Sequence, residues 1–88
     1  MERVRKTIHE CEEGKLIECN GDYEVLVMGI VNEDGIVSSE LKLMATYYAN
    51  GYVRDNLGRL HNLFTNDASE IRSFAIRQYE KLTGVTIG

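Results

Sequence analysis

The chain of 88 residues contains no proline and no tryptophan. Without proline it has neither a rigid linker nor a polyproline ligand segment. Its longest apolar run, Val25–Val31, is far shorter than the roughly 20 residues that a membrane-spanning helix needs. The first residues, Met1 to Lys6, also lack the apolar stretch of a signal peptide. We therefore expect a cytoplasmic protein without a membrane segment.

Cysteine and histidine are scarce. Cys11 and Cys19 are the only cysteines, and in a reducing cytosol we expect both to be free thiols. Together with His9 and His61 they show no Cys-x-x-Cys or His-x-x-x-His spacing, which a zinc site would favour. The sequence also lacks a phosphate-binding glycine loop and a local nucleophile–base motif. We therefore expect no metal, no cofactor and no enzymatic activity.

The composition is that of an ordinary globular domain, with 43% hydrophobic and 27% charged residues. Its length fits one domain over residues 1–88, with a core small enough that sharing it in a homodimer is an attractive solution. The net charge of −4 is unevenly distributed. Residues 1–40 carry ten acidic and four basic side chains, whereas residues 41–88 carry four acidic and six basic ones. This asymmetry predicts an acidic and a basic side that orient docking.

Turn signals dominate the first two thirds of the chain. Asn20-Gly21 and Asn50-Gly51 lie between apolar alternations, and Asn-Gly is the strongest short-range signal of a two-residue hairpin. A third turn is expected at Asn32–Gly35. These turns predict an antiparallel meander. Its expected strands are Leu16–Cys19, Tyr23–Val31, Ile36–Ala49, Tyr52–Asp55 and Arg59–Thr65.

Two of these expected strands have apolar patterns that differ from simple alternation. From Val25 onward both faces of Tyr23–Val31 are apolar, which predicts a central strand covered on both sides. The segment Ile36–Ala49 fits a strand or a helix. As a helix it has Leu41 and Met44 in its apolar stripe, and Ser38 or Ser39 can cap it. We favour a strand because its aromatic and β-branched residues suit a pleated surface. Its apolar face would then comprise Val37, Leu41, Leu43, Ala45 and Tyr47.

Helices are predicted at both ends. In Glu2–Glu13 the apolar residues Val4, Ile8 and Cys11 follow helical spacing, and Gly14 suits the end of a helix. The last helix is expected to begin after Asp67, a good N-cap, and to end at Gly84. Its expected apolar stripe is Ile71, Phe74, Ala75, Tyr79 and Leu82. The fold expected is α+β, with an N-terminal helix, an antiparallel meander of four or five strands and a C-terminal helix packed on one face.

Two groups of residues are candidates for an interface. Tyr47, Tyr48 and Tyr52 cluster around the Asn50-Gly51 turn, and tyrosine is enriched where proteins dock. On the last helix, Ile76 lies outside the expected apolar stripe and next to two arginines. An apolar residue ringed by arginines resembles the centre of an interface. The candidate interface residues on this helix are therefore Arg72, Ile76 and Arg77.

These features favour a small non-enzymatic binding or regulatory protein that acts through protein–protein interaction, for instance as an inhibitor of a larger protein. We expect an unidentified protein partner and a homodimer. The alternative is a small DNA-binding regulator of helix-turn-helix type, which needs residues 39–64 to be helical. The basic side chains of the second half support nucleic-acid binding, whereas the overall acidity opposes it.

Overall fold

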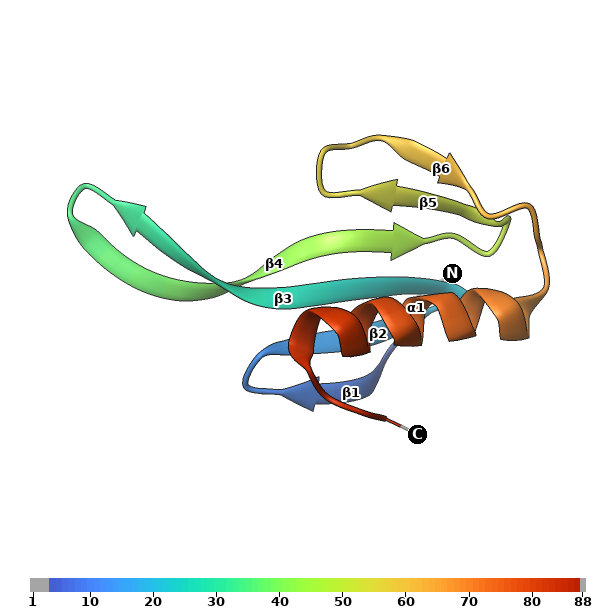
Figure 1. Cartoon of the computed structure of the whole chain (residues 1–88), viewed down its shortest axis with the longest axis horizontal. Helices are drawn as coiled ribbons and strands as arrows, with labels where there is room; N and C mark the ends of the chain where they lie inside the picture. Colours follow the sequence, from blue (N-terminus) through green and yellow to red (C-terminus); the bar gives the residue numbers. More distant parts are fainter. Residues whose placement is uncertain (1–3, 88) are drawn as a thin grey trace.

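The computed structural model describes residues 4–87, which form a six-stranded antiparallel sheet with one helix packed on one face (Figure 1). Each strand pairs with the next strand along the chain, so the sheet is a simple meander. Its strands are β1 (Arg5–Cys11), β2 (Gly14–Cys19), β3 (Asp22–Glu33), β4 (Ile36–Tyr47), β5 (Tyr52–Asp55) and β6 (Leu60–Asn62). The helix α1 (Ala68–Thr83) follows the last strand. The predicted meander and C-terminal helix are therefore present.

The predicted N-terminal helix is wrong, because Arg5–Cys11 is the edge strand β1 and pairs with β2. The sheet therefore has six strands instead of the four or five predicted. The pairing register shifts between Thr7 and His9, which makes Ile8 an extra, bulged residue. A bulge changes which side of the sheet the following residues face. Ile8 and Cys11 consequently both pack against the core, although regular strand alternation would place them on opposite faces. The bulge thus produces a spacing that resembles a helical stripe.

The core lies between α1 and the face of the sheet that the helix covers. Alternate residues of β2 to β5 point toward the helix, as the two-residue period of a strand requires. These core residues are Leu16, Tyr23, Val25, Ala45, Tyr47 and Val53 from the sheet and Ile71, Ala75 and Tyr79 from the helix. Full burial of a side chain such as Leu16 or Ile71 contributes about 1.5–3 kcal/mol, so this one layer supplies most of the available hydrophobic stabilisation.

Both predicted ends of α1 are confirmed. The Asp67 carboxylate accepts hydrogen bonds from the backbone N–H groups of Ser69 and Glu70, at 2.9 and 3.2 Å. Gly84 ends the helix in the left-handed conformation, with φ of 77°, and its N–H donates to the Glu80 carbonyl. No helix within residues 4–87 is long and apolar enough to cross a membrane.

The buried stripe of α1 differs from the predicted one at two positions. Ile71, Ala75 and Tyr79 are buried, as expected, but the Phe74 side chain is 37% exposed. Ile76, predicted to face solvent, instead packs against the core. Phe74 and Ile76 each lie about 100° around the helix axis from Ala75, on opposite sides. Which flank is buried depends on how the helix rests on the sheet, and the periodicity alone does not contain that information.

Two of the predicted hairpin turns are confirmed as two-residue connections. Cys19 pairs with Asp22 across Asn20-Gly21, where both central residues have positive φ, 51° and 88°. Glu33 pairs in the same way with Ile36 across Asp34-Gly35. Backbone angles of this kind match the right-handed twist of the flanking strands.

The Asn50-Gly51 connection is different, and the two-residue prediction is wrong there. The Tyr48 N–H donates to the Tyr52 carbonyl, and the Gly51 N–H donates to the Tyr48 carbonyl, so three residues lie between the paired positions. Only Gly51 of the Asn-Gly pair has a positive φ, 92°. The strand prediction for Ile36–Ala49 is nevertheless confirmed by β4, and the helical alternative is wrong.

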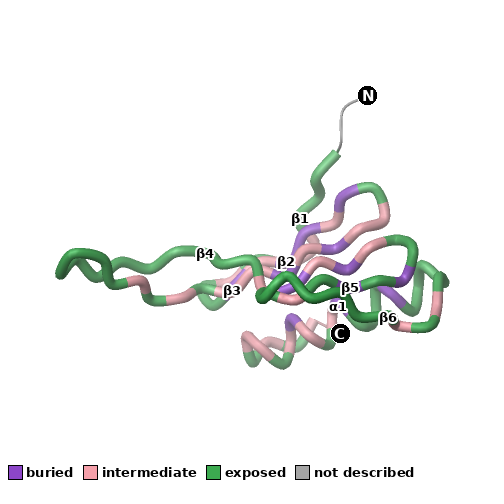
Figure 2. The backbone as a smooth tube through the Cα atoms, turned by 90° about the horizontal axis from the view of Figure 1, so that it is seen from above, coloured by how far each residue is buried: buried purple, intermediate pink, exposed green. Residues whose placement is uncertain are grey.

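The outer halves of β3 and β4 leave the body of the sheet. β2 pairs with β3 only as far as Val27, and β5 pairs with β4 only over Ala45–Tyr47. The residues between these limits form a two-stranded hairpin, here called the arm (residues 28–43), which projects beyond the helix (Figures 1 and 2). The predicted coverage of β3 on both faces is therefore wrong, because α1 covers one face only and the outer half of β3 is largely exposed.

Candidate functional site

The arm has two chemically different faces. Across the hairpin, Met28 pairs with Leu41, and Ile30 pairs with Ser39. These pairs share a face with their neighbours two residues away along each strand. The apolar members of this face, together with the half-buried Leu26 just before the arm, are here called the arm stripe: Leu26, Met28, Ile30, Val37, Leu41 and Leu43. The other face is mixed. It carries the charged residues Glu33, Glu40 and Lys42 and also the apolar residues Val27, Val31 and Ile36.

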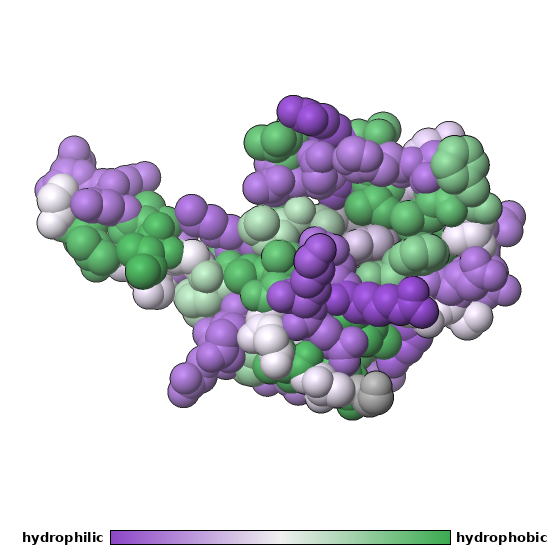
Figure 3. All heavy atoms as spheres, in the orientation of Figure 1, coloured by the Kyte–Doolittle hydropathy of each residue, from purple (hydrophilic) through white to green (hydrophobic). Residues whose placement is uncertain are grey.

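The arm stripe is open to solvent. Ile30 is 76% exposed and Val37 67% exposed, and three further members of the stripe are also exposed. Figure 3 shows apolar side chains gathered on the arm, away from the body of the protein. The members of the arm stripe together expose on the order of 500 Å² of apolar surface. The largest apolar patch on a typical monomer measures roughly 300–600 Å² and is often functional. This patch is the most conspicuous surface feature of the described residues.

A β-bulge determines which way the arm stripe faces. The β3–β4 register shifts at Val25/Leu26, because Val25 pairs with Ala45 whereas Leu26 pairs with Leu43, which leaves Met44 as an extra residue. Ala45 therefore points into the core, while Leu43 points to the opposite face of the sheet. Without the bulge, Leu41 and Leu43 would share the helix-covered face with Ala45. The bulge thus places the arm stripe on the side that α1 leaves uncovered.

The uncovered face continues from the arm onto the body of the sheet. Next to Leu43 is a hollow of about 310 Å³. Its lining residues are Arg5, Cys19, Asp22, Glu24, Leu43, Thr46, Tyr48 and Arg54. Arg5 and Glu24 form an ion pair across it, whereas Arg54 has no salt bridge within residues 4–87. The uncovered face therefore runs from an apolar arm to a body surface that carries charge.

The three predicted interface tyrosines divide between the two faces of the sheet. Tyr48 and Tyr52 line a second hollow on the uncovered face, of about 410 Å³, together with Arg54 and Leu60. Tyr47 instead lies in the core, where burial raises the pKa of its hydroxyl. Tyr47 is therefore unavailable to a partner, while Tyr48 and Tyr52 lie on the uncovered face at the β4–β5 connection, at the end of β4 away from the arm (Figure 1).

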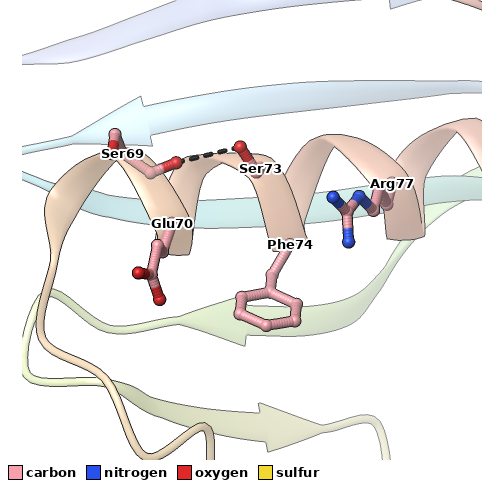
Figure 4. A pocket seen from close by; sticks show the side chains of 5 residues that line it. All are labelled: Ser69, Glu70, Ser73, Phe74 and Arg77. Carbon is pink, nitrogen blue, oxygen red and sulfur yellow. Dashed lines mark hydrogen bonds between the residues drawn. The ribbon is translucent and has the colours of Figure 1, made fainter.

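The predicted helix residues lie on the other side of the molecule. Ile76 packs against the core, and the apolar residue that is exposed beside Arg77 is Phe74. Figure 4 shows Phe74, Glu70 and Arg77 at a shallow hollow of about 290 Å³ on the outer surface of α1. The six predicted interface residues are therefore not brought together at one site.

Two polar clusters involve the histidines. The buried Tyr79 hydroxyl lies 2.9 Å from His9 Nδ1 and 3.3 Å from Cys11 Sγ, and it donates to the Gly14 carbonyl. Burial raises the pKa of Tyr79, and the neighbouring Cys11 raises it further. This cluster ties α1 to the β1–β2 hairpin. Cys11 and Cys19 are free thiols, and residues 4–87 contain no group of three or more potential ligands that could hold a metal ion.

The second histidine belongs to a surface turn. His61 Nε2 lies 2.9 Å from the Asp55 carboxylate. The same carboxylate accepts from the backbone N–H groups of Leu57 and Arg59, and so holds the β5–β6 connection in shape. Both polar clusters thus have a structural role that accounts for their contacts.

The chain matches no protein-family model, no curated protein and no solved structure. The surface that sequence reasoning missed is the arm stripe. A signal for it exists in the continuous apolar run Val25–Val31, but such a run is equally expected of a strand buried on both faces. An exposed arm can be distinguished from a buried strand only from where β2 stops pairing with β3 and where β5 stops pairing with β4.

Proposed function

We propose that this protein is a small non-enzymatic binding protein that regulates another polypeptide by direct contact through the arm stripe. The proposal rests on the exposure of five apolar side chains, Met28, Ile30, Val37, Leu41 and Leu43, on one face of a projecting hairpin. Burial of apolar surface is the main driving force of protein association. An exposed face of this kind is stabilised when another protein covers it.

The uncovered face of the sheet beyond the arm supports the same function. Tyr48, Tyr52 and Arg54 lie together on the uncovered face. Tyrosine and arginine are the residue types that most often dominate binding energy, since they combine large contact area with hydrogen bonding. The arm stripe and this Tyr–Arg group therefore form one contact surface that is apolar at one end and polar at the other.

The form of the arm suits an inhibitor of a larger protein. Its backbone is already paired along its length, and the Asp34-Gly35 turn closes its tip in a favourable conformation. A preorganised hairpin loses little conformational entropy on binding. The helix-turn-helix alternative requires helices over residues 39–64, where β4 and β5 lie. We therefore propose protein binding through the arm instead of DNA binding.

The proposal is tested by capture of partners from the native host with two matched variants. Ile30 and Ile36 are both isoleucines of the arm and are 76% and 69% exposed, but they lie on opposite faces. We expect Ile30→Asp to lose the captured protein and Ile36→Asp to retain it, with nuclease treatment having no effect. For an inhibitor, the captured protein loses activity when the wild type is added. Equal capture by both variants, or loss on nuclease treatment, contradicts the proposal.

A further inference from the structure

We propose that the surface which covers the arm stripe is the arm stripe of a second copy of this chain, packed face to face and antiparallel about a two-fold axis. This inference rests on the proposed function, because it assigns a second occupant to the same contact surface, which a copy of this chain covers when no other partner does. A two-fold dimer uses the same patch on both subunits, so the patch must be complementary to itself. The area, shape and charge of the arm each satisfy this condition.

The area of the stripe is sufficient for a weak dimer. Two stripes that face each other bury on the order of 1,000 Å² of apolar surface, and the flanking polar residues bring the total toward the 1,200–2,000 Å² of a specific interface. The arm projects beyond α1, so the helix does not obstruct a second copy that approaches the stripe (Figure 1). Hairpins stacked in this way lie about 10 Å apart, as in other two-layer sheets.

The shape of the stripe is complementary to itself in the antiparallel orientation. We place the two-fold axis between the Met28/Leu41 row and the Ile30/Ser39 row. The Met28/Leu41 row of one copy then faces the Ile30/Ser39 row of the other copy. The small Ser39 then leaves room for the longer side chains of Met28 and Leu41. The row of Leu26 and Leu43 faces the row that contains Val37. Large and small residues therefore alternate across the contact, as close packing requires.

The charges favour the same orientation. Beyond the stripe, the turn at the tip of the arm carries Asp34, which is exposed and without a salt bridge within the described range. The next row along the second copy, which contains Glu24, Thr46 and Arg54, then lies below this tip. Glu24 is already paired with Arg5, so Arg54 is the charge of this row that has no salt bridge within residues 4–87. Arg54 is exposed on the uncovered face. Each tip thus brings the Asp34 carboxylate toward an arginine that has no salt bridge of its own among the described residues.

Sedimentation equilibrium tests the dimer with the same matched pair of variants. We expect the wild type to dimerise at high micromolar concentration, as befits an interface of this size. Ile30→Asp should raise the dimer dissociation constant by about 100-fold or more, because it places two unpaired carboxylates in the contact. Ile36→Asp should leave it unchanged within about two-fold. A monomeric wild type, or equal loss in both variants, overturns the inference.

A charge exchange tests the orientation. Asp34→Arg and Arg54→Asp should each weaken the dimer by about 2- to 30-fold, because each breaks two symmetry-related exposed pairs. The double variant should regain the wild-type affinity, whereas Asp34→Arg combined with Arg77→Asp, on the outer surface of α1, should not. Absence of rescue overturns the antiparallel arrangement. If the wild type is monomeric but Ile30→Asp still loses a host protein, this inference fails while the proposed function stands.

Discussion

Replacing Gly51 with alanine should destabilise the protein far more than the same change at Gly58. Both glycines end hairpin connections and have nearly the same left-handed φ, 92° and 83°. A Cβ atom added at Gly51 would lie 1.9 Å from the Thr65 carbonyl oxygen, whereas at Gly58 no atom lies within 4 Å. The two variants therefore share the backbone strain and differ only in the steric clash.

The expected magnitudes follow from this difference. A left-handed alanine costs about 1–2 kcal/mol, which is the whole effect expected for Gly58→Ala. Gly51→Ala must also displace the segment before α1, and with it the hydrogen bond from the Leu63 N–H to the Gly51 carbonyl. An unmade buried hydrogen bond adds about 1–3 kcal/mol, so we expect a total of about 3 kcal/mol or more. Urea unfolding of both variants measures the difference in the free energy of unfolding, which appears as a shift of the midpoint urea concentration while the slope m stays constant. Equal destabilisation would refute the close approach of these two segments.

Two further predictions concern the polar clusters. Tyr79→Phe should reduce the free energy of unfolding by about 1–3 kcal/mol, because the buried hydroxyl that donates to the Gly14 carbonyl is lost. Tyr52→Phe on the surface should change this free energy by less than about 0.5 kcal/mol, and urea unfolding measures both variants. The hydrogen bond with His61, and next that from the Arg59 N–H, lowers the pKa of Asp55 from 3.8 to about 2. Because the folded value lies below the unfolded one, wild type should be more stable than Asp55→Asn above about pH 4, and this advantage should vanish as the pH falls to about 2. An advantage that persists at low pH in thermal unfolding would exclude this linkage.

The parts of the fold that depend on local chemistry were predictable from sequence. Asn20-Gly21 specifies its turn because few other residue pairs tolerate two consecutive positive φ angles. Asp67 and Gly84 mark the ends of α1 for equally local reasons, the acceptance of free N–H groups and the left-handed cap. These signals are independent of tertiary packing.

The parts that failed depend on strand parity and on pairing between distant residues. The bulge at Ile8 gave β1 an apolar spacing like that of a helix. The bulge at Met44 separated Leu41 and Leu43 from Ala45, with which strand alternation had grouped them on one face. A bulge inserts one residue without a distinctive sequence signal, and it reverses the face of the residues beyond it.

The candidate site was missed for the same reason. The tyrosines around the Asn50-Gly51 connection were correctly suspected to be close together, and Tyr48 and Tyr52 do line one hollow. The arm stripe, by contrast, arises because β2 and β5 stop pairing before the long hairpin ends. An apolar alternation shows that one side of a strand is to be covered, but it does not show whether the cover comes from the same chain.

The central claim is that the uncovered face of the arm is a contact surface filled by a second copy of the chain. Isoleucine-methyl NMR spectra of the wild type, recorded from low micromolar to millimolar concentration, test it without any mutation. We expect the Ile30 methyl signal to shift as dimers form, while the signals of Ile36, on the opposite face, and of the buried Ile71 stay in place. An Ile30 signal that does not depend on concentration, or an Ile36 signal that shifts equally, would contradict the claim.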